Sequence, residues 1–111
     1  MTNRIIMYRQ GDVLLTKIKK LPKGSKIKRT DIILEGEATG HAHRLVNGTI
    51  YEKFLWPDNG MYVDATSGYA KIVHDEHNTI EIESGYYVVT RQREYEPSRF
   101  TRDGQSRWVL D

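Results

Sequence analysis

The amino-acid sequence predicts a small all-β protein, either a β-barrel or a β-sandwich built from about eight short antiparallel strands. No segment keeps a helical spacing of apolar residues over several turns. Instead, β-branched and aromatic runs are interrupted by turn residues at intervals of roughly eight to twelve residues. Because 111 residues are the usual length of one domain, we expect residues 1–111 to form a single β domain.

The expected strands follow one another along the chain, and residues that favour turns separate them. Pro22 and Gly24 break the first half, as does the pair Asn47 and Gly48, and the motifs "PDNG" and "HDEHN" break the second half. We expect the tail 97–111 to add an edge strand or a short helix. Trp56 and Trp108 are expected to anchor the core or an interface. The expected strands are 4–8, 13–19, 30–37, 41–46, 48–56, 61–65, 69–73, 79–83 and 86–95.

The composition excludes several classes of protein. The chain has no cysteine, so disulfides, thiolate metal ligands and cysteine nucleophiles are excluded. It also lacks the Gly-x-Ser-x-Gly motif, the P-loop and the GxGxxG motif, so nothing supports a serine hydrolase, an NTPase or a dinucleotide-binding protein. The first residues contain no apolar run long enough for a signal peptide or a membrane span. We therefore expect a cytoplasmic protein, in the host cytoplasm if a phage encodes it, with no membrane partner.

Charge is distributed unevenly along the chain. Residues 1–30 carry nine lysines and arginines against one acidic residue, Asp12, although the net charge of the whole chain is only +2. We favour a solvated, lysine-rich pair of N-terminal strands. The alternative is a non-enzymatic binding module, such as a phage structural or host-interaction protein, whose basic surface binds an acidic protein or nucleic acid. Exposed strand edges also lead us to expect a homo-oligomer.

The first of two histidine pairs lies in the stretch "GHAHRLVNGTIYE". Asn47 and Gly48 are typical of a two-residue hairpin turn, because both residues tolerate positive φ angles. That turn would place His43 opposite Glu52. Because side chains alternate between the two faces of a strand, His41, His43 and Glu52 would then share one largely apolar face.

The second pair lies in "YAKIVHDEHNTIEI", where two strand registers compete. A three-residue loop, 75–77, would pair His74 with Asn78 and would place Ile72 opposite Ile80 and Ala70 opposite Ile82. A two-residue loop would instead pair His74 with His77. We favour the first register because it gathers the aliphatic residues on one face, with His74 among them and His77 at the tip of the loop.

These residues together predict a metal site. Three imidazoles and a carboxylate suit zinc, iron, manganese or nickel. We expect His41, His43 and His74 to be the metal ligands, with Glu52 as the fourth ligand or general base and His77 as a substitute ligand or an acid–base partner. An ion with an open position would bind a small molecule, and whether a reaction follows is left open. Two alternatives remain, namely metal-free acid–base chemistry and polar residues that only line the mouth of a barrel.

The spacing of the histidines resembles the cupin metal-binding pattern. In that pattern a glycine precedes His-x-His, a glutamate follows, and a second motif reads His-x-x-x-Asn. Here "GHAH" supplies His41 and His43, and "HDEHN" supplies His74 and Asn78. The resemblance implies a β-barrel with a divalent metal in its pocket, and the match of Glu52 depends on the hairpin register. The arrangement is also similar to that of small proteins of phages and bacteria.

Overall fold

The computed structural model describes residues 5–35 and 41–91, which contain ten β-strands and no helix. The prediction of an all-β protein of short antiparallel strands is confirmed, and the strands form a sandwich-like pair of sheets rather than a closed barrel. No helix in this part of the chain is long and apolar enough to cross a membrane. The strands are β1 (Met7–Gln10), β2 (Val13–Ile18), β3 (Lys26–Lys28), β4 (Ile32–Glu35), β5 (Ala42–Val46), β6 (Thr49–Lys53), β7 (Gly60–Asp64), β8 (Lys71–His74), β9 (His77–Glu81) and β10 (Tyr86–Arg91).

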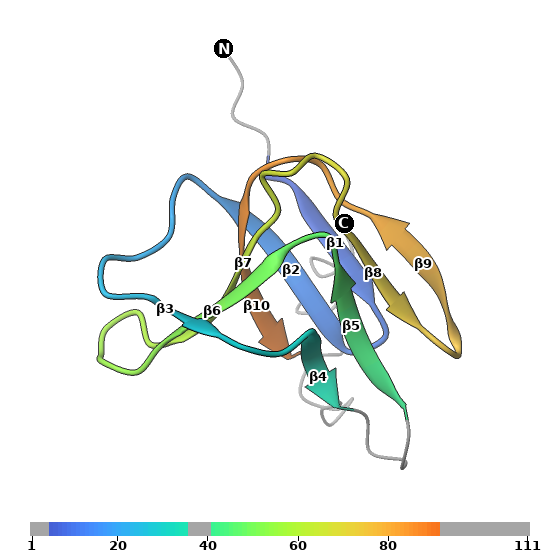
Figure 1. Ribbon diagram of the computed structural model, residues 1–111, viewed down its shortest axis with the longest axis horizontal. Helices are drawn as coiled ribbons and strands as arrows, with labels where there is room; N and C mark the ends of the chain where they lie inside the picture. The colour runs from blue at the N-terminus through green and yellow to red at the C-terminus, as the bar shows by residue number, and fades with distance from the viewer. Residues whose placement is uncertain (1–4, 36–40, 92–111) are drawn as a thin grey trace, which may run out of the picture.

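Two sheets make up the sandwich (Figure 1). The larger sheet has six strands in the order β1-β2-β10-β7-β6-β3, and the smaller has four in the order β4-β5-β8-β9. Every pairing is antiparallel. Contacts between β1 and β9 join the edges of the two sheets on one side. This junction brings the β1–β2 turn to the smaller sheet.

The core lies between the sheets and follows the alternation of each strand. In β2, Val13 and Leu15 are buried while Leu14 and Thr16 are partly exposed. Burial of such aliphatic and aromatic side chains is the main force that holds two sheets face to face. The buried cluster is Val13, Leu15, Ile33, Leu45, Ile50, Val63, Ala65, Ala70, Ile72, Ile82 and Tyr87.

The predicted hairpin at Asn47 and Gly48 is wrong. Asn47 has the positive φ of 62° that the sequence suggested, but β5 pairs with β4 and β8, whereas β6 pairs with β3 and β7. The chain therefore turns a corner from one sheet to the other. Both arrangements bury Leu45 and Ile50 equally well, so the hydrophobic pattern could not distinguish a hairpin from a corner between sheets.

The β8–β9 hairpin combines the two registers that the sequence allowed. Ile72 lies opposite Ile80, as expected from the longer loop, yet His74 lies opposite His77 across the shorter loop. A β-bulge between these two pairs reconciles them, because one residue of β8 faces two residues of β9. The expectation that His77 lies at the loop tip is therefore wrong, since it is the first residue of β9.

Two further expectations are corrected. The short strand β3 lies in a segment that we expected to be only a turn and its flank. The strand expected over 48–56 ends at Lys53, and Trp56, which we expected in the core or at an interface, is 82% exposed, so only the core alternative is wrong. Trp108 and the tail 97–111 lie outside the described residues.

Candidate functional site

The four histidines of the chain lie together at one end of the smaller sheet. His43 lies in β5, His41 immediately precedes that strand, and His74 and His77 face each other across the β8–β9 turn. The ring centroid of His74 is 4.3 Å from that of His43, 4.6 Å from that of His77 and 6.0 Å from that of His41. The rings of His43 and His77 are 5.8 Å apart. The pairing of β5 with β8 creates this proximity between residues distant in sequence.

His43 is the most deeply placed of the four residues. It precedes Leu45 on the inward face of β5, and only 2% of it is exposed. Its position follows from the period of two along a strand, which also sends Leu45 into the core. The expectation that His43 points inward is confirmed.

A buried glutamine determines which nitrogen of His43 carries the proton. The Gln10 amide nitrogen donates to the carbonyl oxygens of Ile72 at 3.0 Å and of Asn78 at 2.9 Å. Both amide hydrogens are thereby used, so Oε1 of Gln10 acts as the acceptor for Nδ1 of His43 at 2.8 Å. Neutral His43 therefore holds its proton on Nδ1 and keeps a free lone pair on Nε2.

The free lone pair of His43 faces a carboxylate. Oδ1 of Asp12 lies 3.5 Å from Nε2 of His43, and the other carboxylate oxygen, Oδ2, accepts a hydrogen bond of 3.1 Å from Nε of Arg91. Burial alone would raise the pKa of Asp12, but the hydrogen bonds from Arg91 and from the backbone, together with the positive charge of Arg91, hold this pKa below its usual value. Asp12 is therefore an anion at neutral pH.

His43 is neutral under the same conditions. Burial is the largest cause that lowers its pKa, and the charge of protonated His74 lowers it further. The carboxylate of Asp12 opposes this effect without reversing it. As a result, two acceptor atoms, the Nε2 of His43 and the Oδ1 of Asp12, face each other.

His74 and His41 occupy the outer part of the site. Nδ1 of His74 accepts a hydrogen bond of 3.0 Å from the backbone N–H of Glu76, so neutral His74 carries its proton on Nε2. Nδ1 of His41 lies 3.1 Å from Oδ2 of Asp75 without forming a hydrogen bond, and it is the one buried side-chain nitrogen in the described residues that lacks a hydrogen-bond partner. Carboxylates therefore border the four imidazoles on two sides.

The β1–β2 turn packs directly on the imidazoles. Gly11, with φ of +60°, leaves no room for a side chain, because a Cβ atom there would lie 2.7 Å from Nε2 of His77 and 3.2 Å from Cε1 of His43. This glycine lies between Gln10 and Asp12, so one turn contributes both residues that contact His43. No spacing rule in the sequence links this turn to the histidines.

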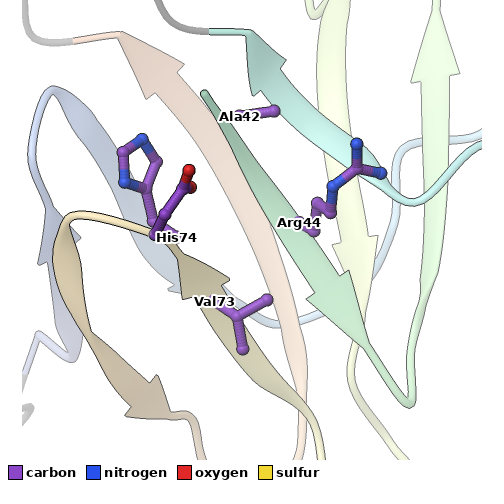
Figure 2. A pocket seen from close by; sticks show the side chains of 5 residues that line it. Ala42, Arg44, Val73 and His74 are labelled. Carbon is purple, nitrogen blue, oxygen red and sulfur yellow. The ribbon is translucent and has the colours of Figure 1, made fainter. Parts of the chain in front are cut away.

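A pocket of about 280 Å³ adjoins the imidazoles on the outer side of the smaller sheet. Figure 2 shows His74 and Arg44 on its opposite sides, with Ala42 on β5 and Val73 on β8 between them. The Arg44 guanidinium donates to Asp31 at 3.0 Å. One wall of the pocket therefore carries an arginine that is paired with a carboxylate, and the other carries the His74 imidazole and the Asp75 carboxylate.

Not every predicted site residue joins this group. Glu52 lies on β6 in the other sheet, opposite Lys26 and 3.7 Å from Nζ of Lys28. Its predicted position opposite His43 is wrong because β5 and β6 do not pair. His41, His43, His74 and His77 do come together. In residues 5–35 and 41–91, however, no three histidine or acidic side chains stand in an arrangement that could hold a metal ion without moving.

The comparisons with known proteins give one match. The chain belongs to the family described as Domain of unknown function (DUF8820), whose profile matches residues 9–92. No curated protein and no solved structure matches the chain. The matched range contains all four histidines together with Gln10, Asp12 and Arg91.

Proposed function

For this member of the DUF8820 family, we propose that the site binds a divalent transition metal, with His43 and Asp12 as its inner ligands. The observation that carries the proposal is the 3.5 Å separation between Nε2 of His43 and Oδ1 of Asp12, which sets a carboxylate against the nitrogen opposite the one that contacts Gln10. A cation placed between the carboxylate and this nitrogen would be attracted to both. Zinc bonds to nitrogen and carboxylate oxygen are about 2.0–2.2 Å long. Two atoms bound to the same zinc ion therefore lie slightly closer together than the 3.5 Å observed between Nε2 of His43 and Oδ1 of Asp12.

The surrounding imidazoles can complete the coordination. With metal–nitrogen bonds of about 2.0–2.1 Å, the centroids of two ligating rings lie roughly 5 Å apart. The observed centroid distances of 4.3–6.0 Å span this value. His41, His74 and His77 are less buried than His43 and can rotate towards an ion, while Gln10 holds the ring of His43 in place.

Ligand rotation is a necessary part of the proposal. His74 must give up the hydrogen bond that its Nδ1 accepts from Glu76, or it must leave coordination to His41 and His77. The resemblance to the cupin pattern supports the same histidines, with Asp12 in the place that we had expected Glu52 to fill. Imidazole and carboxylate together suit zinc, iron, manganese or nickel.

The neighbouring pocket provides space for a small-molecule ligand. His74 is one of the four histidines, and Asp75 lies beside His41. Both residues also line this pocket. An ion held by three protein groups would keep a position for water or a substrate, whereas an ion held by four would be structural. Arg44, on the opposite wall, has further N–H donors besides the one that contacts Asp31, and these can donate to a polar ligand.

Metal analysis of protein purified without a histidine tag tests the proposal. We expect near-stoichiometric zinc, iron, manganese or nickel, or uptake of one of these by EDTA-treated protein in calorimetry. The double variant His43→Gln/His77→Ala, checked for folding by circular dichroism, should lose this uptake. Failure of the folded wild-type protein to take up any of the four metals would refute the proposal.

A further inference from the structure

An exposed apolar loop lies at the opposite end of the molecule from the β8–β9 turn and its histidines. We propose that the β6–β7 loop and the β2–β3 segment together bind single-stranded nucleic acid, with aromatic rings stacking on bases and lysines contacting phosphates. Figure 1 shows this end on the left, where the loop after β6 lies beside β3, and the β8–β9 turn on the right. The proposal does not depend on metal binding.

Three consecutive apolar side chains protrude from the β6–β7 loop. Phe54, Leu55 and Trp56 are 73%, 73% and 82% exposed. Leaving three large apolar side chains in water is unfavourable, and adjacent exposed apolar residues commonly mark a binding surface. Trp and Phe rings provide flat faces on which unpaired bases stack.

The base of this loop is closed by specific contacts. Nζ of Lys53 forms an ion pair with Asp58 across the loop. The Tyr62 hydroxyl donates a hydrogen bond of 2.6 Å to the carbonyl oxygen of Asp58. These contacts hold the ends of the loop together and direct its three apolar side chains outwards.

A lysine-rich segment lies on one side of the apolar loop. The pairing of Lys26 with Glu52 brings the segment before β3 next to the end of β6, and a Cβ atom on Gly24 would lie 3.7 Å from Cε of Lys53. The two nearby acids, Glu52 and Asp58, are already paired with Lys28 and Lys53. Between β2 and the end of the β3–β4 connection, five exposed cations form no ion pair with any other described residue: Lys19, Lys20, Lys23, Lys26 and Arg29.

Charge complementarity identifies a polyanion as the occupant, and the aromatic rings favour nucleic acid. Single strands are favoured over duplex because their bases are free to stack on side chains. An anionic membrane is the competing occupant, since Phe, Leu and Trp flanked by lysines also suit a lipid interface.

Fluorescence anisotropy with a labelled oligo(dT) of roughly 16 nucleotides tests this proposal. We expect binding that weakens steeply as salt rises. Trp56→Ala and Phe54→Ala should each reduce affinity about tenfold, and Lys19→Gln/Lys20→Gln/Lys23→Gln should reduce both the affinity and the salt dependence. The matched control is Tyr69→Ala, which removes another aromatic residue, 78% exposed, from the β7–β8 connection and should bind as the wild type does.

The competing outcomes are distinct. The proposal is overturned if the wild-type protein does not bind the oligonucleotide at low salt, or if Tyr69→Ala weakens binding as much as Trp56→Ala does. It is also overturned if Trp56 is required for binding to phosphatidylserine-containing vesicles while no oligonucleotide binds. Because all the substituted side chains are exposed, unchanged urea denaturation curves will separate lost binding from lost folding.

Discussion

Oε1 of Gln10 accepts a 2.8 Å hydrogen bond from Nδ1 of His43, and this contact joins the edge of the larger sheet to the interior of the smaller one. The same glutamine donates to two backbone carbonyl groups of β8 and β9. One buried amide therefore stabilises the junction of the two sheets and orients the imidazole that we propose as the fixed metal ligand.

Gln10→Ala tests both roles. The substitution leaves the His43 Nδ1 hydrogen and two carbonyl oxygens without this partner, so we expect the free energy of unfolding to fall by roughly 2–4 kcal/mol. Loss of tautomer control should also weaken metal binding about 10–100-fold in the protein that remains folded. Urea denaturation and metal titration measure these effects, and Thr90→Ala, at an exposed position of β10, is the control. An unchanged metal affinity would show that His43 does not need Gln10.

Gly11→Ala should lower the free energy of unfolding more than Gly68→Ala does. Gly11 and Gly68 both have positive φ angles, +60° and +87°, so alanine strains the backbone at both positions. Only at Gly11 does the new Cβ atom meet His77, whereas nothing lies within 4 Å at Gly68. We expect Gly11→Ala to cost roughly 1–3 kcal/mol more than Gly68→Ala in urea denaturation. Equal costs would mean that His77 moves away freely.

Asp12→Asn and Glu52→Gln distinguish the observed site from the one that we expected from the sequence. Asn keeps the size of Asp12 but removes the charge that faces His43, so we expect metal affinity to fall by about tenfold or more. Glu52 lies on the other sheet, so Glu52→Gln should leave affinity unchanged. Calorimetric titration of the two variants gives the comparison. A larger loss of metal affinity in Glu52→Gln than in Asp12→Asn would show that Glu52, and not Asp12, binds the metal.

The metal-free protein should lose stability as pH falls below the ordinary titration range of histidine. Burial and the neighbouring imidazoles lower the pKa of His43 from 6.5, so the unfolded chain binds a proton more readily than the folded chain does. The stabilisation is thus present above about pH 6.5 and decreases as pH falls towards the lower, folded-state pKa. Urea denaturation in EDTA between about pH 7.5 and 5.5 measures it. The neutral variant His43→Gln should show a weaker dependence, and an equally strong one would assign the effect to other groups.

Much of the fold could be predicted because local patterns encode it. The β-branched and aliphatic run in Val13–Ile18 and the turn residues Pro22 and Gly24 were sufficient to predict β2 and its end, whereas the strand expected over 4–8 lies at Met7–Gln10. The pairing of Ile72 with Ile80 also followed from matching aliphatic residues. What the pattern could not predict was the partner of β5, because a hairpin and a corner bury Leu45 and Ile50 alike.

The candidate site divides in the same way. The sequence by itself determined that His43 points inward, since its position relative to Leu45 follows from the geometry of one strand. Only the tertiary structure decided which groups meet its imidazole. Asp12 and Gln10 reach the imidazole because β1 contacts β9 across the sheet edges. Glu52 lies away from it because the chain passes from one sheet to the other after Val46. The face of a strand to which a side chain points is a local property of that strand. The neighbours of a buried side chain, in contrast, depend on how the sheets assemble from distant segments.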